Sequence, residues 1–231
     1  MNIGIIGSGT VAQTLGERLL QVGQQVMISS RDPDAAKDLG ERGVLPAAVA
    51  WATAQYDQGR PAAAGTFAEA ASFGELLVNA TAGTGSLAAL AAADPADIDG
   101  KILLDLSNPL DFSQGMPPRL SVCNDDSLAE QIQAAYPTAR VVKTLNTVTV
   151  AVMVDPAQLG EETELFVAGN DPGARTWVAD TVLRDWLGWT RIVDLGDLTG
   201  ARALEMYLPL WLRLWGATGT PLLNVRLAVA R

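Results

Sequence analysis

The sequence contains no histidine. This absence excludes a histidine general base, a Ser-His-Asp triad and an ordinary histidine-bearing zinc site. Cysteine is nearly absent too: Cys123 is the only one, so the chain forms no internal disulfide and suits a reducing cytoplasm. Any reaction must therefore use another proton donor or need little help from the protein, and we expect no bound metal.

Positive charge and long apolar runs are also scarce. The 231 residues carry 16 Lys and Arg against 26 Asp and Glu, a net charge of −10, so we expect neither a nucleic-acid nor a membrane partner. The longest apolar candidate, 206–215, is interrupted by Pro209 and Arg213 and is too short to span a membrane. A strand that begins at residue 2 leaves no room for a signal peptide, which again favours the cytoplasm. An anionic ligand must be held by local donors.

The first residues of the chain hold its most informative motif. Residues 2–6 form an apolar run that predicts a buried strand, and a helical pattern follows a glycine-rich turn. Gly7 permits a tight turn, Gly9 lets a pyrophosphate approach the backbone, and Ala12 lets the helix pack close to the strand. Free N–H groups at a helix start attract phosphate. A turn without a ligand is the alternative, but we expect dinucleotide binding by Gly7, Ser8, Gly9, Thr10, Val11 and Ala12.

The second expected strand, 25–28, ends in two hydroxyls and a guanidinium. In NAD binders this strand usually ends in a carboxylate that binds the ribose hydroxyls. Ser29, Ser30 and Arg31 suit a dianionic 2′-phosphate instead, which a carboxylate would repel. The tripeptide therefore predicts NADP as the cofactor, with a solvated loop as the alternative. We expect Asp32 to cap a following helix rather than to neutralise Arg31.

Three later strands end in small or polar residues. These residues are Ala80, Thr81 and Ala82 after 75–79, Asn108 and Pro109 after 101–105, and Asn146 after 139–145. Because the carboxyl ends of parallel strands meet at one edge of a sheet, we expect all of them beside the cofactor. Asn108 is suited to the nicotinamide carboxamide, and Pro109 fixes the backbone beyond it. For 80–82 a plain turn is the alternative to contact with a ribose or nicotinamide.

The order of the elements predicts the fold class. Nearly half of the residues, 48%, are hydrophobic and only 6% are aromatic, which is typical of an alanine-rich α/β protein. Helices are expected at 34–42, 46–58, 66–72, 87–93, 128–136, 172–186 and 204–215, and further strands at 62–66, 164–168 and 191–194, with a loop over 111–127. This order predicts a Rossmann-type doubly wound parallel sheet with a smaller C-terminal helical part. The expected domains are 1–147, which binds NADP, and 148–231, which extends the sheet.

Several segments together resemble one family. Besides the glycine turn and Ser-Arg, they are Asn-Ala-Thr at 79–81, Ser-Asn-Pro-Leu-Asp-Phe at 107–112, Val-Lys-Thr-Leu-Asn-Thr at 142–147 and Glu-Met-Tyr-Leu-Pro-Leu-Trp-Leu-Arg-Leu at 205–214. They are similar to segments of the coenzyme F420-dependent NADP reductases, and the resemblance covers nearly the whole chain. It implies a commonly dimeric Rossmann protein that moves a hydride between NADP(H) and the deazaflavin coenzyme F420. It also places Thr10, Ser30 and Arg31 near the adenosine 2′-phosphate.

The sequence departs from some members of that family at two positions. Asn146 stands where some carry histidine, and Lys143 stands where some carry a small residue. Hydride transfer between two coenzymes fits the lack of histidine, because both carry their own electronics and the protein mainly positions them. No catalytic residue is therefore assigned. A helical face with Leu208, Trp211, Leu212 and Trp215 predicts a core or dimer contact, or else the wall of a pocket for a flat ring.

Two other functions stay open at this point. An NADPH-dependent carbonyl or imine reductase would need a proton donor, for which Lys143 and Tyr207 are the candidates. Burial on the strand 139–145 could lower the pKa of Lys143 toward a useful value. A non-catalytic redox sensor would bind NADP(H) without turning over any acceptor.

Overall fold

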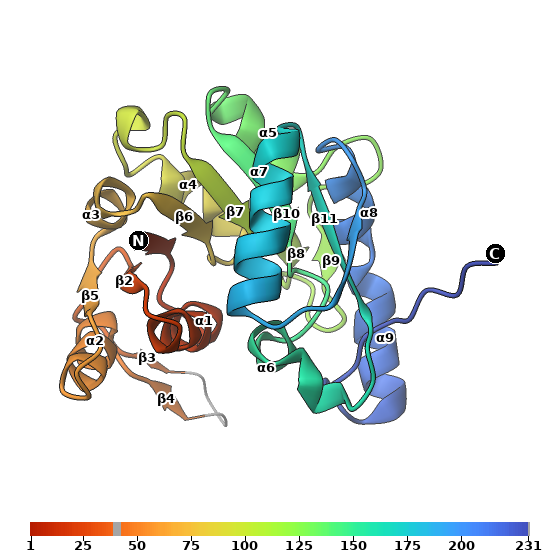
Figure 1. Cartoon of the computed structure of the whole chain (residues 1–231), viewed down its shortest axis with the longest axis horizontal. Helices are drawn as coiled ribbons and strands as arrows, with labels where there is room; N and C mark the ends of the chain where they lie inside the picture. The colour runs from red at the N-terminus through yellow and green to blue at the C-terminus, as the bar shows by residue number, and fades with distance from the viewer. Residues whose placement is uncertain (39–42, 231) are drawn as a thin grey trace.

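The computed structural model describes residues 1–38 and 43–230 (Figure 1). Its main sheet is built from β1 (Asn2–Ile6), β2 (Gln25–Ser29), β5 (Ala62–Gly65), β6 (Leu76–Asn79), β7 (Ile102–Asp105), β10 (Arg140–Thr144), β11 (Glu164–Gly169) and β12 (Arg191–Asp194). Their order across the sheet is β12-β11-β10-β7-β6-β1-β2-β5. The strands from β5 to β10 are parallel, whereas β11 pairs antiparallel with β10 and β12 pairs parallel with β11. The expected Rossmann-type fold class is confirmed.

Helices cover both faces of this sheet. They are α1 (Thr10–Gln21), α2 (Ala48–Tyr56), α3 (Phe67–Phe73), α4 (Ser86–Leu90), α5 (Leu128–Ala135), α6 (Val150–Val154), α7 (Pro172–Trp177), α8 (Gly200–Met206) and α9 (Leu208–Thr218). Shorter turns are η2 (Gly83–Gly85), η3 (Pro95–Asp97) and η4 (Pro156–Leu159), and the π-helix η5 (Val178–Trp186) continues α7. One core joins the sheet to α1, α2, α6, α7 and η5, and the other joins it to α3, α4, α5 and α8.

The strands have two buried faces because successive side chains alternate between the two cores. In β1, Ile3 and Ile5 belong to the core with α1, while Ile6 belongs to the core on the opposite face. All three are fully buried, as expected for a parallel sheet covered on both sides. The start of α3 is fixed by a capping box, in which Thr66 and Glu69 bind each other's backbone N–H groups.

The helix expected over 34–42 is wrong in the part that the structure describes. Lys37–Asp38 forms the strand β3, which pairs antiparallel with β4 (Val44–Leu45), and residues 39–42 lie outside the described chain. The side chain of Asp32 accepts a hydrogen bond from Asp34 N at 3.2 Å, so it closes a turn and caps no helix. Ala35 and Ala36 are both exposed. Helix-favouring residues without an apolar face to bury do not hold a short helix.

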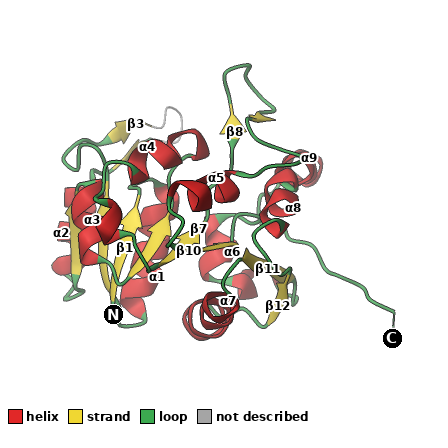
Figure 2. Ribbon diagram, turned by 90° about the horizontal axis from the view of Figure 1, so that it is seen from above, coloured by secondary structure: helices red, strands yellow, loops and turns green. Residues whose placement is uncertain are grey.

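Two further expectations from the sequence also change. The loop 111–127 contains the second strand of a small hairpin, formed by β8 (Leu110–Asp111) and β9 (Arg119–Leu120), which projects beyond the sheet in Figure 2. The helix expected over 204–215 is two helices, because α8 ends before Tyr207 and α9 begins after it. Pro209 lies in the first turn of α9, where its missing N–H has no intrahelical partner to lose.

After α9 the chain runs extended beside β11, where Glu164 N donates to Val225 O at 3.3 Å. The carboxylate of Glu164 in turn accepts a hydrogen bond from Leu227 N at 2.8 Å. Beyond this contact the C-terminus projects from the body of the molecule (Figure 1). Across residues 1–38 and 43–230, every helix is too short or too polar to cross a membrane.

Candidate functional site

The glycine turn lies between β1 and α1, at the carboxyl edge of the sheet. Gly7 has φ of +136°, and a Cβ at this position would lie 2.7 Å from Ala80 O, so only glycine fits. At Gly9 the backbone is extended, and a Cβ would meet no described atom within 4 Å. Within the described chain no side chain caps α1, and its first turn carries no acidic residue. The start of α1 is therefore free to receive an anion.

The turn forms the floor of a first chamber of about 300 Å³. Its walls are the turn itself, the end of β2, the end of β6 and two helices. The lining residues are Gly7, Ser8, Gly9, Ser29, Ser30, Arg31, Lys37, Phe67, Ala80, Thr81, Ala82, Gly85 and Ala89. Three segments singled out from the sequence thus meet at one place, as the doubly wound topology requires.

The polar groups at the end of β2 have two roles: one ties β2 to β1, and the others line the first chamber. Ser29 is fully buried, and its hydroxyl donates to Ile5 O at 2.7 Å, so this hydroxyl ties β2 to β1. Ser30 and Arg31 line the chamber, and Arg31 is exposed. Lys37, from β3, brings a second cation to the same chamber, and partial burial lowers its pKa. Two local cations therefore offset the negative charge of the whole chain at this point.

A second chamber of about 340 Å³ adjoins the first. Its walls come from the ends of β6, β7 and β10, the start of α1, the hairpin β8–β9, and α6 and α9. The lining residues are Val11, Thr81, Ala82, Gly83, Thr84, Leu106, Ser107, Asn108, Leu110, Phe112, Asn146, Val148, Thr149, Val150, Met153, Leu208 and Trp211. Thr81 and Ala82 line both chambers, so together the chambers form one elongated site. Among the described lining residues of the second chamber, none is ionisable.

Most of the residues expected to bind the cofactor line one of the two chambers. Val11, Asn108 and Asn146 line the second chamber and not the first. Among the described chamber walls, Thr10, Ala12 and Pro109 do not appear. Ala12 is buried against the sheet, and Pro109 is buried with its carbonyl oxygen accepting from Ser121 N at 2.8 Å. Both residues therefore support the turns that line the chambers.

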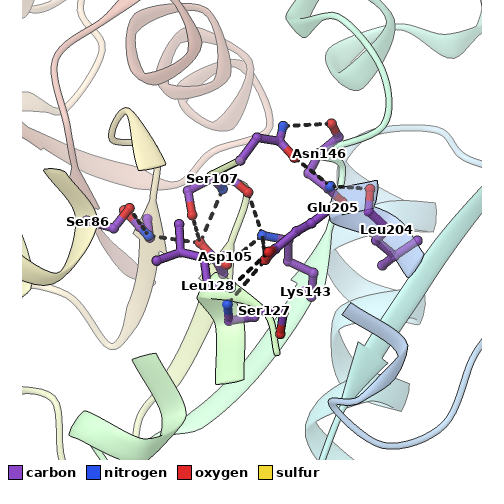
Figure 3. Close-up of polar contacts among 12 residues, drawn as sticks. Ser86, Asp105, Ser107, Ser127, Leu128, Lys143, Asn146, Leu204 and Glu205 are labelled. Atoms are coloured by element: carbon purple, nitrogen blue, oxygen red, sulfur yellow. Dashed lines mark hydrogen bonds and ion pairs between the residues drawn. The ribbon is translucent and has the colours of Figure 1, made fainter. Parts of the chain in front are cut away.

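A buried ionic network joins Lys143, Asp105 and Glu205 (Figure 3). Lys143 Nζ lies 2.8 Å from Asp105 Oδ2 and 2.9 Å from Glu205 Oε1, and each of these side chains is at most 1% exposed. Glu205 also accepts hydrogen bonds from Leu128 N at 2.8 Å and Ala129 N at 3.2 Å, at the start of α5. The network thus joins β7, β10, α5 and α8, and the positive end of α5 helps to hold its second carboxylate.

The same network fixes the polar wall of the second chamber. Lys143 donates to Ser107 O, and the Ser107 hydroxyl donates to Asp105 Oδ1 at 2.7 Å. Asn146 donates to Asn108 Oδ1 at 2.8 Å and to Leu204 O at 3.0 Å, while Asn108 donates to Asn146 O at 3.0 Å. The two asparagines therefore bind each other and α8, which holds the ends of β7 and β10 at a fixed separation.

Neither candidate proton donor reaches the site. Burial alone would lower the pKa of Lys143, but the attraction of Asp105 and Glu205 outweighs burial and raises it, so the expectation of a lowered pKa is wrong. Burial raises the pKa of Tyr207. Within the described walls of both chambers, neither Lys143 nor Tyr207 is present. A general acid of the kind that a ketone needs is not provided by these two residues.

A Rossmann sheet with a glycine turn, two cations beside the second strand and an adjoining apolar chamber defines the class of NADP-dependent oxidoreductases. A family model described as "NADP oxidoreductase coenzyme F420-dependent" matches residues 2–109. The crystal structure of a protein from Arthrobacter sp. FB24, provisionally described as an F420-dependent NADP reductase, is similar over its whole length. It has a TM-score of 0.89 and 45% identity, and the match covers 99% of this chain and 100% of that one. The chain belongs to the family of F420-dependent NADP reductases.

Two curated relatives match over part of their length. The F420-dependent NADP reductase of Methanocaldococcus jannaschii is 31% identical over 119 residues, which is 51% of this chain and 52% of that protein. The metalloreductase STEAP3 of Rattus norvegicus is 28% identical over 213 residues, which is 90% of this chain and 37% of that protein. The chain therefore spans about half of the archaeal reductase and a smaller share of the rat protein.

The structure adds two residues that sequence reasoning missed. Lys37 falls within the segment expected to be a helix, and only the pairing of β3 with β4 brings it to the first chamber. Glu205 is separated by more than sixty residues from Lys143, and no local pattern signals that the two side chains meet. Over residues 1–38 and 43–230, no group of three or more acidic, cysteine or histidine side chains is placed to hold a metal ion.

Proposed function

We propose that this chain transfers a hydride between NADP(H) and the deazaflavin coenzyme F420. The observation that carries the proposal is the second chamber, whose described walls contain no ionisable side chain. A ketone acceptor would need a protein acid at the developing alkoxide, a contribution of ~10²–10⁴-fold. Two redox coenzymes need only to have their reacting carbons, C4 of nicotinamide and C5 of the deazaflavin, held together. In this proposal the accompanying proton comes from water.

In this proposal the two chambers bind different parts of the two coenzymes. The first suits the adenosine half of NADP, with the pyrophosphate at Gly9 and the start of α1 and the 2′-phosphate near Ser30, Arg31 and Lys37. The second suits the nicotinamide and the deazaflavin ring, because aliphatic and aromatic side chains make up most of its wall. Thr81 and Ala82, which belong to both chambers, support a cofactor that extends from one into the other.

Arg31→Ala should weaken NADPH binding and leave NADH binding nearly unchanged. The substitution removes a charge-assisted contact to the 2′-phosphate of about 1.5–3 kcal/mol, or roughly tenfold to a hundredfold in affinity. Equilibrium titration of both nucleotides measures the two losses separately. An equal loss for NADPH and NADH would contradict a role for Arg31 in reading the 2′-phosphate. Lys37→Met, tested in parallel, should act in the same direction if both cations face that phosphate.

The activity is tested by mixing the protein with NADPH and oxidised F420 and following the visible absorbance of F420. Bleaching that depends on the protein supports the proposal. No bleaching, together with consumption of NADPH on a ketone or imine, would replace it with the carbonyl or imine reductase. Nucleotide binding without turnover on any of these acceptors would replace it with the redox sensor.

The remaining expectations are part of the same proposal. Residues 1–147 serve as the NADP-binding domain, and 148–231 extend the sheet and close the second chamber, which the positions of Leu208 and Trp211 support. The protein works in the cytoplasm as a homodimer. Leu210 and Trp215 are exposed on α9, which supports a partner surface there.

A further inference from the structure

Buried side-chain atoms without a hydrogen-bond partner are concentrated beside the second chamber. Of the six such atoms among the described residues, five belong to two segments, 146–149 and 207–211. These five are Asn146 Oδ1, Thr147 Oγ1, Thr149 Oγ1, Tyr207 OH and Trp211 Nε1. Buried polar groups in native proteins nearly always pair, so a cluster of unpaired ones calls for a specific cause.

Of these five atoms, the indole nitrogen of Trp211 has the fewest ways to find a hydrogen-bond partner. It lines the second chamber and is only 8% exposed, and its indole nitrogen is a donor only. A hydroxyl can turn toward any neighbouring donor or acceptor, whereas the indole N–H needs an acceptor. The more deeply buried Trp189 shows the usual arrangement, since its indole N–H donates to Met153 O at 3.1 Å. Trp211 has no such partner among the described residues.

We propose that the indole N–H of Trp211 binds a ring carbonyl oxygen of the second substrate and thereby orients it in the chamber. The inference rests on the proposed function, in which that substrate is a flat deazaflavin with carbonyl oxygens on its pyrimidine ring. The wall around Trp211 is suited to such a ring: Leu208, one turn earlier on α9, offers aliphatic surface, and the chamber holds no charge among its described residues. Trp211 is thus a specificity-determining residue.

The position of α9 makes this role compatible with NADP in the same site. The nicotinamide is expected at the end of the chamber formed by Thr81 and Ala82, because these residues also line the first chamber. In Figure 2, α9 stands on the opposite side of the strand ends from β3, which carries Lys37. The indole nitrogen is covered in this structure, so the side chain has to turn when the carbonyl oxygen arrives.

The first test is the binding of oxidised F420 to Trp211→Phe. Loss of the N–H should raise the dissociation constant and KM for F420 by about 5–50-fold, because a buried carbonyl oxygen is left unpaired. The dissociation constant for NADPH should stay within about twofold. Trp177→Phe is the matched control, since Trp177 is on α7, packs against Trp186 and lies outside the described walls of both chambers. This control should bind F420 like the original protein.

A second variant separates the hydrogen bond from the loss of ring area. Site-specific replacement of Trp211 by 3-benzothienylalanine keeps the size of the indole and exchanges N–H for sulfur. It should reproduce most of the loss in F420 affinity. Unchanged F420 affinity in this variant would overturn the inference, and so would an equal loss for NADPH, which would place Trp211 at the nicotinamide. If the original protein itself neither binds nor reduces F420, the proposed function fails instead.

Discussion

Gly9→Val should reduce NADPH affinity by at least ~10²-fold while the fold survives. Gly9 has φ of −74°, a value open to any residue, and an added Cβ meets no described atom within 4 Å. The valine side chain would instead occupy the first chamber and cover the free N–H groups at the start of α1. Losing two charge-assisted hydrogen bonds to the pyrophosphate costs about 3 kcal/mol or more. Equilibrium titration with NADPH measures this loss.

A second glycine supplies the control for this change. At Gly216 on α9 an added Cβ also meets no described atom within 4 Å, and Gly216 is absent from the described walls of both chambers. Gly216→Val should therefore bind NADPH normally. Chemical denaturation should show at most a small loss of stability for Gly9→Val and no loss for Gly216→Val, because valine is a better helix former than glycine. Normal NADPH binding by Gly9→Val would mean that the turn is structural and that the nucleotide lies elsewhere.

The parts of this structure that could be predicted from sequence are those set by neighbouring residues. The apolar run of β1, the capping-box spacing of Thr66 and Glu69 and the spacing of Gly7 and Gly9 are local signals with a direct physical meaning. Parallel topology then brings the ends of β1, β2 and β6 to one edge, which is why the first chamber could be anticipated.

The parts that could not be predicted depend on contacts between distant segments. The strand at Lys37 exists through its pairing with β4, and the environment of Lys143 exists through Glu205 on α8. The position of Lys143 on the expected strand 139–145 is compatible with burial but gives no sign of its partners, and the partners reverse the direction of its pKa shift. Burial and ion pairing act in opposite directions on a lysine, so the position of the residue alone could not decide the outcome.

Lys143→Met should lower the free energy of unfolding by about 3–5 kcal/mol, because it leaves two buried carboxylates without their cation. Lys143 is fully buried, and both Asp105 and Glu205 lie within 2.9 Å of its ammonium group. Lys101→Met is the control, since the ammonium group of Lys101 makes one hydrogen bond among the described residues, to Ala71 O at 2.9 Å, and the residue is partly exposed. Its loss should be about 1 kcal/mol. Urea denaturation of the two variants compares them directly.

The pH dependence follows from the direction of the pKa shift. The pKa of Lys143 in the folded protein is raised above its ordinary value of 10.5. The ion pair therefore contributes its full stability below the unfolded pKa and loses it only as the pH rises through the folded pKa. The difference in free energy of unfolding between the original protein and Lys143→Met should therefore not fall as the pH rises from about 7 to 9.5. A fall over that range would contradict the raised pKa.

The same variant also decides between the two enzyme functions. If Lys143 only holds the chamber wall through Ser107 and Glu205, folded Lys143→Met should reduce F420 with a loss of less than ~10²-fold, below the usual range for a lost general acid. Its pH–rate profile should keep its shape. Lys143→Met combined with Glu205→Gln should be less destabilised than the sum of the two single variants, because the second change removes one of the unpaired charges. A loss of kcat in F420 reduction greater than ~10²-fold in Lys143→Met, with a new pH dependence and unchanged NADPH affinity, would instead make Lys143 a proton donor and favour the carbonyl reductase.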